Sequence, residues 1–331
     1  MISNMLSRRA ALGVLTTATV APLLGACSTT STAGAGAAPE KDSAGYPRTI
    51  TTDAGPITIE SEVASLVALS SDIADVALAL IEPSRLAAVP RTTTEPAHSH
   101  FASEARQVPH IVEVQGVGDP EKVLSYAPDL VALTTRHERE SDARAQLEHA
   151  GVPMVAITNS WDTPEVFAGN VRLLGAALGA ETAAAELVVD HRRRWDAVAK
   201  AAPSTPAERQ PVVGIVRTIA DNLYVTGPGS IGAAVLQAAG VRNLAERAGL
   251  AKTSRLEVEP LVKARPDVLA LVDSTGTGRK QYAQWLASPG VAQLPAVRDD
   301  KLIMISSGDI ASGTGGIVAL EKIATALDGW R

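Results

Sequence analysis

Basic and aromatic side chains follow several strand-like runs of this sequence, where they could hold an anionic ligand. Arg136 and His137 come directly after the run "DLVALTT", Arg217 comes directly after the run "VVGIV", and Tyr224 lies in the next run, "NLYVTG". Because ligands of parallel α/β sheets bind outside the carboxyl ends of the strands, we expect these four residues to line a ligand pocket. The two guanidinium groups can each bind a pair of carboxylate-type oxygens, which predicts an oxygen-rich anionic ligand.

Four further polar residues lie in loops that follow predicted strands. His98 and His100 belong to the polar segment 91–107, which is too long for a plain connector, while Asp273 follows "DVLALV" and Asp309 follows "KLIMIS" and two more residues. Two histidines one residue apart could project the same way and hold a metal ion, but no neighbouring cysteine or carboxylate cluster completes such a site. We therefore expect all four residues at the pocket or its rim, and no metal site.

The first 48 residues are typical of an exported lipoprotein. Arg8 and Arg9 precede an apolar run that ends at Cys27, the only cysteine of the chain, which predicts a signal peptide with a lipobox over residues 1–26. A Ser/Thr/Gly/Ala-rich tether then covers residues 27–48, which argues against a buried N-terminal helix. We expect lipidation of Cys27 to anchor the mature protein on the outer side of the cell membrane, with Sec and twin-arginine export both open.

The stretch "GPGSIG" at residues 227–232 fits the pattern G-x-G-x-x-G between a predicted strand and a predicted helix. In isolation this pattern predicts a bound dinucleotide, so a secreted oxidoreductase stays open as an alternative. Nicotinamide cofactors are scarce outside the cytoplasm and Pro228 stiffens the loop, so we interpret the glycines as the tight turn that begins the helix. Ser230 does not fit a hydrolase nucleophile, because Pro228 occupies the first glycine position of G-x-S-x-G. We predict neither enzyme activity nor a bound cofactor.

Length and composition indicate an α/β protein with two lobes. The chain has 331 residues, which exceeds what one hydrophobic core usually supports, and its formal net charge of −6 argues against a nucleic-acid partner. Strand-like and helix-like runs alternate, which predicts Rossmann-like lobes with parallel sheets over residues 49–162 and 204–331. Residues 163–203 between them carry no strand pattern, and we expect a single long connecting helix there.

One motif occurs once in each predicted lobe. "EKVLSYAPDLVAL" occupies residues 121–133 and "EPLVKARPDVLAL" occupies residues 259–271, so that Glu121 corresponds to Glu259 and each Pro-Asp pair precedes an aliphatic run. A glutamate in the first turn of a helix is favoured by the helix dipole alone and needs no partner. A matched pair, one in each lobe, instead predicts a shared role at the surface.

These motifs, the stretch "TGPGSIGAAVLQAAGVRNLA" at residues 226–245, the lipobox and the strandless middle together resemble a known family. It is the family of substrate-binding proteins of ABC importers for ferric siderophores, heme and cobalamin, and the resemblance covers residues 60–331. It implies two lobes joined by a rigid helix, a ligand cleft between them and only small hinge motion. It also implies that Glu121 and Glu259 meet arginines on the two subunits of a permease dimer, which works with its ATPase. A two-fold permease presents the same basic pocket twice.

Within the family that the chain resembles, we expect a ferric siderophore as the ligand, because the family uses it most widely and because Arg136 and Arg217 could face its anionic oxygens. Heme is the second candidate, with His137 and Tyr224 as axial ligands from opposite lobes, as in some heme-binding members. Cobalamin is the third. A cell-surface scaffold without a ligand is a further alternative. We expect the protein to be a monomer.

Overall fold

The computed structural model describes residues 45–52, 55–113, 119–135, 140–158, 161–219, 222–311 and 313–330. The predicted signal peptide and the three candidate residues Cys27, Arg136 and His137 lie outside the described residues. The last three residues of the segment 27–48, which we predicted as a tether, belong to the folded part of the chain. Tyr46 is only 2% exposed and belongs to the first hydrophobic core, and the first strand already begins at Arg48.

The first lobe is built on a five-stranded sheet in which neighbouring strands are parallel. In spatial order the strands are β5 (His110–Val112), β4 (Leu86–Pro90), β3 (Leu66–Ala68), β6 (Leu130–Thr135) and β7 (Met154–Thr158). The other elements of this lobe are the hairpin β1 (Arg48–Thr52) and β2 (Gly55–Ile59), the short 3-10 helices η1 (Pro83–Arg85) and η2 (Arg91–Thr94), and helices α1 (Ser71–Leu80), α2 (Ala102–Ala105), α3 (Pro120–Leu124) and α4 (Glu140–His149).

The strands of this lobe appear in the sequence as continuous apolar runs, and strand β6 shows the reason. Leu130 and Ala132 belong to one buried cluster, whereas Val131 and Leu133 belong to another. Alternate residues of a strand point to opposite faces, so apolar side chains cover both faces of the sheet. The parallel sheet predicted for this lobe is therefore confirmed.

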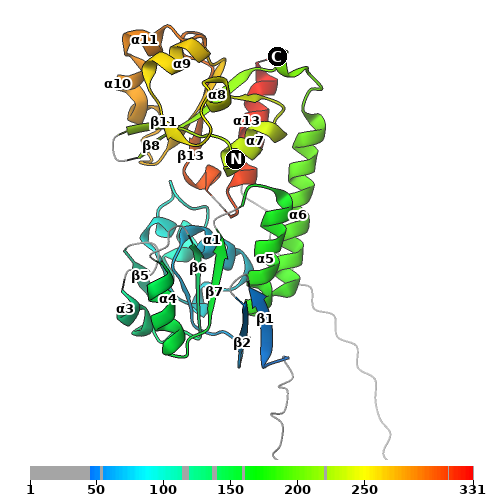
Figure 1. Ribbon diagram of the computed structural model, residues 1–331, viewed down its shortest axis with the longest axis vertical. Helices are drawn as coiled ribbons and strands as arrows, with labels where there is room; N and C mark the ends of the chain where they lie inside the picture. The colour runs from blue at the N-terminus through cyan, green and yellow to red at the C-terminus, as the bar shows by residue number, and fades with distance from the viewer. Residues whose placement is uncertain are drawn as a thin grey trace, which may run out of the picture. The chain divides into compact units, whose positions relative to one another are not determined.

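The segment between the lobes is two helices, not the single helix expected over residues 163–203. Helix α5 (Pro164–Leu178) ends at Gly179, whose left-handed backbone (φ 68°) turns the chain into α6 (Glu181–Ala201). Helix α6 has 21 residues and is therefore about 31 Å long at about 1.5 Å per residue. Its N-terminal half packs in the core of the first lobe through Val188, and Trp195 packs in the core of the second lobe. Figure 1 shows α6 in green, running alongside α5 and on toward α13 (Gly316–Gly329).

The second lobe has a mixed sheet, which corrects the expectation that both sheets are parallel. Its strands in spatial order are β11 (Ser254–Arg255), β9 (Asn222–Val225), β8 (Val212–Ile219), β12 (Val268–Asp273) and β13 (Leu302–Ser306). The short strand β10 (Arg242–Asn243) pairs with the first two residues of β8. Strands β10, β12 and β13 run parallel to β8, but β9 is antiparallel to it. Only two residues separate β8 from β9 in the sequence, too few for the crossover that a parallel pair requires.

Seven α-helices and three short 3-10 helices complete the described part of this lobe. They are α7 (Ile231–Ala238), α8 (Leu244–Arg247), α9 (Val258–Ala264), α10 (Ala283–Leu286), α11 (Pro289–Ala292), α12 (Pro295–Arg298), α13, η3 (Ala207–Arg209), η4 (Gly278–Tyr282) and η5 (Gly308–Ile310). Within the residues that the structure describes, no helix is long and apolar enough to span a bilayer.

Candidate functional site

A cavity of about 470 Å³ lies between the two lobes, where strands of both sheets end. The first lobe contributes Ser71 and Trp161, which follow β3 and β7. The second lobe contributes Arg217 near the end of β8 and Ser274 and Ser307, which follow β12 and β13. Loops at the carboxyl ends of parallel strands thus form this cavity, as the ligand-site rule for α/β sheets predicts.

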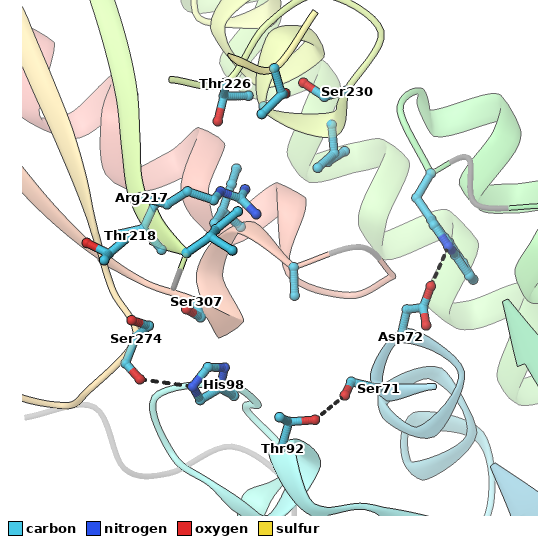
Figure 2. Close-up of a pocket in the computed structure, with 18 of the residues that line it drawn as sticks. Ser71, Asp72, Thr92, His98, Arg217, Thr218, Thr226, Ser230, Ser274 and Ser307 are labelled. Carbon is cyan, nitrogen blue, oxygen red and sulfur yellow. Dashed lines mark hydrogen bonds between the residues drawn. The ribbon is translucent and has the colours of Figure 1, made fainter. Parts of the chain in front are cut away.

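Hydroxyl groups dominate the polar lining of the cavity. They belong to Ser71, Thr92, Thr218, Thr226, Ser230, Thr253, Ser274 and Ser307. The hydroxyls of Ser71 and Thr92 lie 2.6 Å apart and form one hydrogen bond between η2 and the start of α1 (Figure 2). A hydroxyl can donate or accept, so this lining can bind a ligand that carries many oxygen atoms.

Arg217 provides positive charge at the cavity. Within the described residues no carboxylate forms an ion pair with its guanidinium group, and its buried Nε has no hydrogen-bond partner. In Figure 2 the side chain points into the space between Thr226 and Ser230 on one side and Ser307 on the other. Burial lowers the pKa of Arg217, and the nearby Tyr282 opposes this shift, but an arginine remains charged at any physiological pH. A partly desolvated cation without a counter-ion favours an anionic ligand.

Trp161 forms part of the first-lobe wall and is held there by a buried carboxylate. Asp72, which is 2% exposed, accepts a hydrogen bond from Trp161 Nε1 at 3.0 Å and another from Thr134 Oγ1 at 2.7 Å. Because Asp72 lies in the first turn of α1, the helix fixes the position of the indole ring (Figure 2). This tryptophan can therefore report on a ligand in the cavity through its fluorescence.

His98 lies at the cavity and bridges the two lobes. Its Nε2 is 2.9 Å from the backbone carbonyl of Ser274 (Figure 2). A carbonyl only accepts, so Nε2 donates the proton in this hydrogen bond.

The glycine-rich loop forms the tight turn that we expected at the start of a helix. Ser230 Oγ accepts a hydrogen bond from Ala233 N and donates one to the Gly227 carbonyl at 2.7 Å, so that it caps α7. The strand before this loop, β9, is antiparallel to β8. A dinucleotide-binding fingerprint requires a parallel βαβ unit, so the structure argues against the secreted oxidoreductase.

A family model described as periplasmic binding protein matches residues 66–307, which include both sheets and most of the cavity lining. The chain belongs to the periplasmic binding protein family. In agreement with its fold, the family match begins at β3 and ends directly after β13.

Three proteins are similar to this periplasmic binding protein over most of its length. An uncharacterized ABC transporter substrate-binding lipoprotein of Bacillus subtilis (strain 168) is 24% identical over 277 residues, which cover 82% of each chain. The structure of a periplasmic heme binding protein from Pseudomonas aeruginosa is 26% identical, with a TM-score of 0.64 and coverage of 80% of this chain and 92% of that one. An ABC-type Fe3+-hydroxamate transport system from Saccharomonospora viridis DSM 43017 shares the fold at 21% identity, with a TM-score of 0.66 and coverage of 85% and 99%.

Of the predicted ligand-binding residues, the structure brings Arg217 and His98 together at the cavity of this periplasmic binding protein. Tyr224 does not line the cavity. It lies inside strand β9, where it pairs with Arg217 of β8. Arg136 and His137 lie outside the described residues, so their predicted contact with the ligand stays a prediction.

Asp273 also does not line the cavity. Its carboxylate accepts hydrogen bonds from the amides of Gly278 at 2.7 Å and Thr275 at 3.0 Å, and so holds its own loop. Partial burial raises the pKa of Asp273, but these hydrogen bonds outweigh burial and lower it overall. The side chain therefore shapes the loop that carries Ser274 and does not face the ligand.

Asp309 and His100 pair with each other instead of lining the cavity. Asp309 is fully buried, and His100 Nε2 lies 3.1 Å from its Oδ1. Its other oxygen accepts hydrogen bonds from Lys322 and from the amide of Ser306. Burial raises the pKa of Asp309, but the hydrogen bonds from His100 and Lys322 lower it well below its ordinary value. Within the described residues, no group of three or more His, Cys, Asp or Glu side chains could hold a metal ion.

Several lining residues were not assigned to the site from the sequence. Trp161 follows β7, and ligands of α/β sheets bind where parallel strands end, a relationship that we call the strand-end rule. This rule could therefore have assigned Trp161 to the site from the sequence. Thr226 and Thr253 had no such signal, because the antiparallel strands β9 and β11 bring them to the cavity.

The two glutamates of the repeated motif are both exposed. Glu121 lies in the first turn of α3 and Glu259 in the first turn of α9. In Figure 1 these two helices lie on the side of the lobes away from α5 and α6. The surface position that the motif predicts is therefore present in both lobes.

Proposed function

We propose that this protein is the extracytoplasmic solute-binding component of an ABC importer and that its ligand is a ferric siderophore. The membership of the periplasmic binding protein family supports a role in solute capture. The Bacillus subtilis relative, an ABC transporter substrate-binding lipoprotein, supports an ABC importer. The Saccharomonospora viridis structure, that of an Fe3+-hydroxamate transport system, supports a ferric hydroxamate as ligand.

Arg217 carries the ligand proposal. Its guanidinium group enters a cavity lined by hydroxyls and has no carboxylate partner among the described residues. A ferric siderophore presents a shell of negatively polarised oxygens around the metal. Such a ligand would pair with the guanidinium group and accept or donate hydrogen bonds at the hydroxyls, without any direct bond between the protein and iron.

Heme is the second candidate, because the Pseudomonas aeruginosa heme binding protein is 26% identical. The described cavity lining supports heme less well than a siderophore. It includes no tyrosine and a single histidine, His98, whose Nε2 is occupied by the Ser274 carbonyl. Axial ligation of heme iron would then depend on His137, which lies outside the described residues.

Delivery to the importer would use the two exposed glutamates and the lipid anchor. Glu121 and Glu259 would contact arginines of the permease dimer, whose ATPase drives transport, and Cys27 would carry the lipid that keeps the protein at the membrane. A monomer suits this arrangement, since one molecule already presents a glutamate on each lobe.

A thermal-shift panel tests the choice of ligand. Purified protein is heated with ferric hydroxamate, catecholate and citrate chelates, with hemin and with cobalamin, all at the same concentration; a ligand present at about 100 times its dissociation constant adds about 2.7 kcal/mol to stability. We expect a raised Tm with at least one ferric siderophore and a smaller shift with hemin. A shift with hemin alone, accompanied by a Soret band, would replace the siderophore with heme.

A further inference from the structure

The sequence His98-Ser99-His100 contacts the second lobe at two points. Nε2 of His98 hydrogen-bonds to the backbone carbonyl of Ser274 at 2.9 Å, and Nε2 of His100 lies 3.1 Å from Oδ1 of Asp309. Both partners belong to loops at the carboxyl ends of β12 and β13. The two histidines of this motif therefore cross from the first lobe to the second beside the ligand cavity.

Both sides of these contacts are anchored within their own lobes. Ser99, between the two histidines, donates a hydrogen bond at 2.5 Å to Asp75, a buried residue of α1. On the second lobe, Asp309 is held by Lys322 of α13. A movement of either loop would therefore have to break hydrogen bonds inside its own lobe or shift a whole helix.

The backbones of the two loops are also in direct contact. The amide of Gly308 donates a hydrogen bond to the carbonyl of Ala97 at 3.0 Å. A Cβ atom added to Gly308 would lie 3.0 Å from the carbonyl carbon of His98 and 3.1 Å from the amide nitrogen of Ser99. Backbone atoms cannot move aside as a flexible side chain can, so any other residue at position 308 would push the two loops apart.

Asp309 makes the separation of the lobes energetically costly. Its side chain is fully buried, and a buried carboxylate is stable only with its hydrogen-bond partners. Nε2 of His100, which belongs to the opposite lobe, lies 3.1 Å from Oδ1 of this carboxylate. Parting the loops would remove this polar contact from the buried carboxylate and would break the Ala97 to Gly308 hydrogen bond at the same time.

We propose that residues 97–100 of the first lobe, together with Ser274 and residues 306–309 of the second, form an inter-lobe latch that sets the distance between the lobes and thereby selects the ligand by size. The selection rests on the proposed function, while the latch itself does not. His98 is the positioning residue that connects the latch to the ligand, because its ring lines the cavity. A closed latch fixes this end of the cavity, so a chelate larger than the space between the lobes would have to break the latch in order to bind.

The latch is tested first without a ligand, on the full-length protein. Hydrogen exchange at position 308 and the radius of gyration from small-angle scattering are compared for wild type, His98→Ala/His100→Ala and Gly308→Ala. We expect exchange at position 308 to become at least tenfold faster and the radius of gyration to increase in both variants.

His110→Ala and Gly169→Ala are the matched controls, since His110 stacks on Tyr126 within the first lobe and a Cβ at Gly169 meets nothing within 4 Å. Unchanged exchange and scattering in both latch variants would overturn the proposal.

Size selection is tested with small and large ferric chelates of the hydroxamate, catecholate and citrate classes, compared in pairs within the class that wild type binds. In the double histidine variant, we expect the ratio of their dissociation constants to shift at least tenfold toward the larger chelate. His98→Gln can still donate a hydrogen bond to the Ser274 carbonyl and should restore the wild-type ratio. An open latch with an unchanged ratio would contradict the size selection. If wild type binds none of the chelates, the proposed function is wrong, while exchange and scattering still decide whether the latch exists.

Discussion

Asp129 and Asp267 make equivalent contacts in the two lobes. Oδ2 of Asp129 accepts hydrogen bonds from the amides of Ala64 at 3.0 Å and Ser65 at 2.9 Å, directly before β3. Oδ2 of Asp267 accepts a hydrogen bond from the amide of Val212 at 2.7 Å, at the start of β8. Asp129 directly precedes β6, which lies next to β3, and Asp267 directly precedes β12, which lies next to β8. In each lobe the aspartate of the repeated Pro-Asp pair therefore connects the beginnings of two adjacent strands. This part of the repeat serves the fold.

Replacing these aspartates should therefore weaken the fold and spare the ligand site. Asp129→Ala leaves two backbone amides without their charged acceptor, and we expect the free energy of unfolding to fall by about 1–3 kcal/mol. Urea denaturation measures the change, with the exposed Glu60→Ala as the control. Loss of affinity without loss of stability would contradict the structural role.

The glutamates of the same repeat should behave in the opposite way. Both are exposed, so Glu121→Arg with Glu259→Arg should abolish uptake by cells while the ligand affinity and the Tm of the purified protein stay unchanged. The double variant Glu60→Arg with Glu208→Arg changes the net charge equally at other exposed positions and is the matched control. Normal uptake by the Glu121/Glu259 variant would show that the two glutamates only stabilise their helices.

Arg217→Met should separate stability from binding. The guanidinium group is largely buried and has no counter-ion among the described residues, so an apolar side chain of similar length should leave the ligand-free protein equally stable or more stable by about 1 kcal/mol. The same variant should lose about tenfold to a hundredfold in affinity for an anionic chelate, because a charge-assisted hydrogen bond contributes about 1.5–3 kcal/mol. Urea denaturation and titration calorimetry measure the two effects. A strong loss of stability in the ligand-free protein would show that Arg217 has a structural partner.

Asp75 should make stability depend on pH. Burial raises the pKa of this carboxyl from 3.8 to about 7, against the hydrogen bond from Ser99 and the nearby His100. The folded protein thus keeps a proton that the unfolded chain has already released, so the contribution of Asp75 to stability falls as pH rises from about 4 to about 7.

Asp75→Asn removes this titration and keeps an oxygen that can accept the hydrogen bond from Ser99. Urea denaturation measures the free energy of unfolding of the variant minus that of wild type. We expect this difference to increase from pH 4 to pH 7 and to stay constant above pH 7. A difference that does not change with pH would mean that Asp75 is already ionised in the folded protein at low pH.

Local signals were sufficient to predict most of the architecture. The apolar runs and Pro-Asp pairs gave the order of strands and helices, and the strand-end rule placed Arg217 and His98 at the cavity. The direction of β9 was not predictable from periodicity, because an alternating or apolar pattern does not distinguish a parallel from an antiparallel strand. The expectation that Tyr224 lines the pocket was wrong, since Tyr224 lies inside the antiparallel strand β9 and is not among the residues that line the cavity.

The orientations of Asp273 and Asp309 also could not be predicted from sequence. Both follow strands, as a ligand-binding residue would, but Asp309 turns away to Lys322 and His100, and Asp273 turns to the amides of its own loop. These choices depend on tertiary contacts between segments that are far apart in the chain. The position of a loop can thus be inferred from the order of elements, whereas the direction of a side chain within it cannot.

Fluorescence titration of Trp161 tests the central claim most directly, since this indole lines the same cavity as Arg217. The protein is titrated with the ferric siderophore that raises the Tm most, in wild type, in Arg217→Ala and in Trp161→Phe. We predict saturable quenching in wild type, at least tenfold weaker binding in Arg217→Ala, and loss of most of the signal in Trp161→Phe. Equal affinity of wild type and Arg217→Ala, or no saturable quenching by any iron chelate, would contradict an anionic iron chelate held between the lobes.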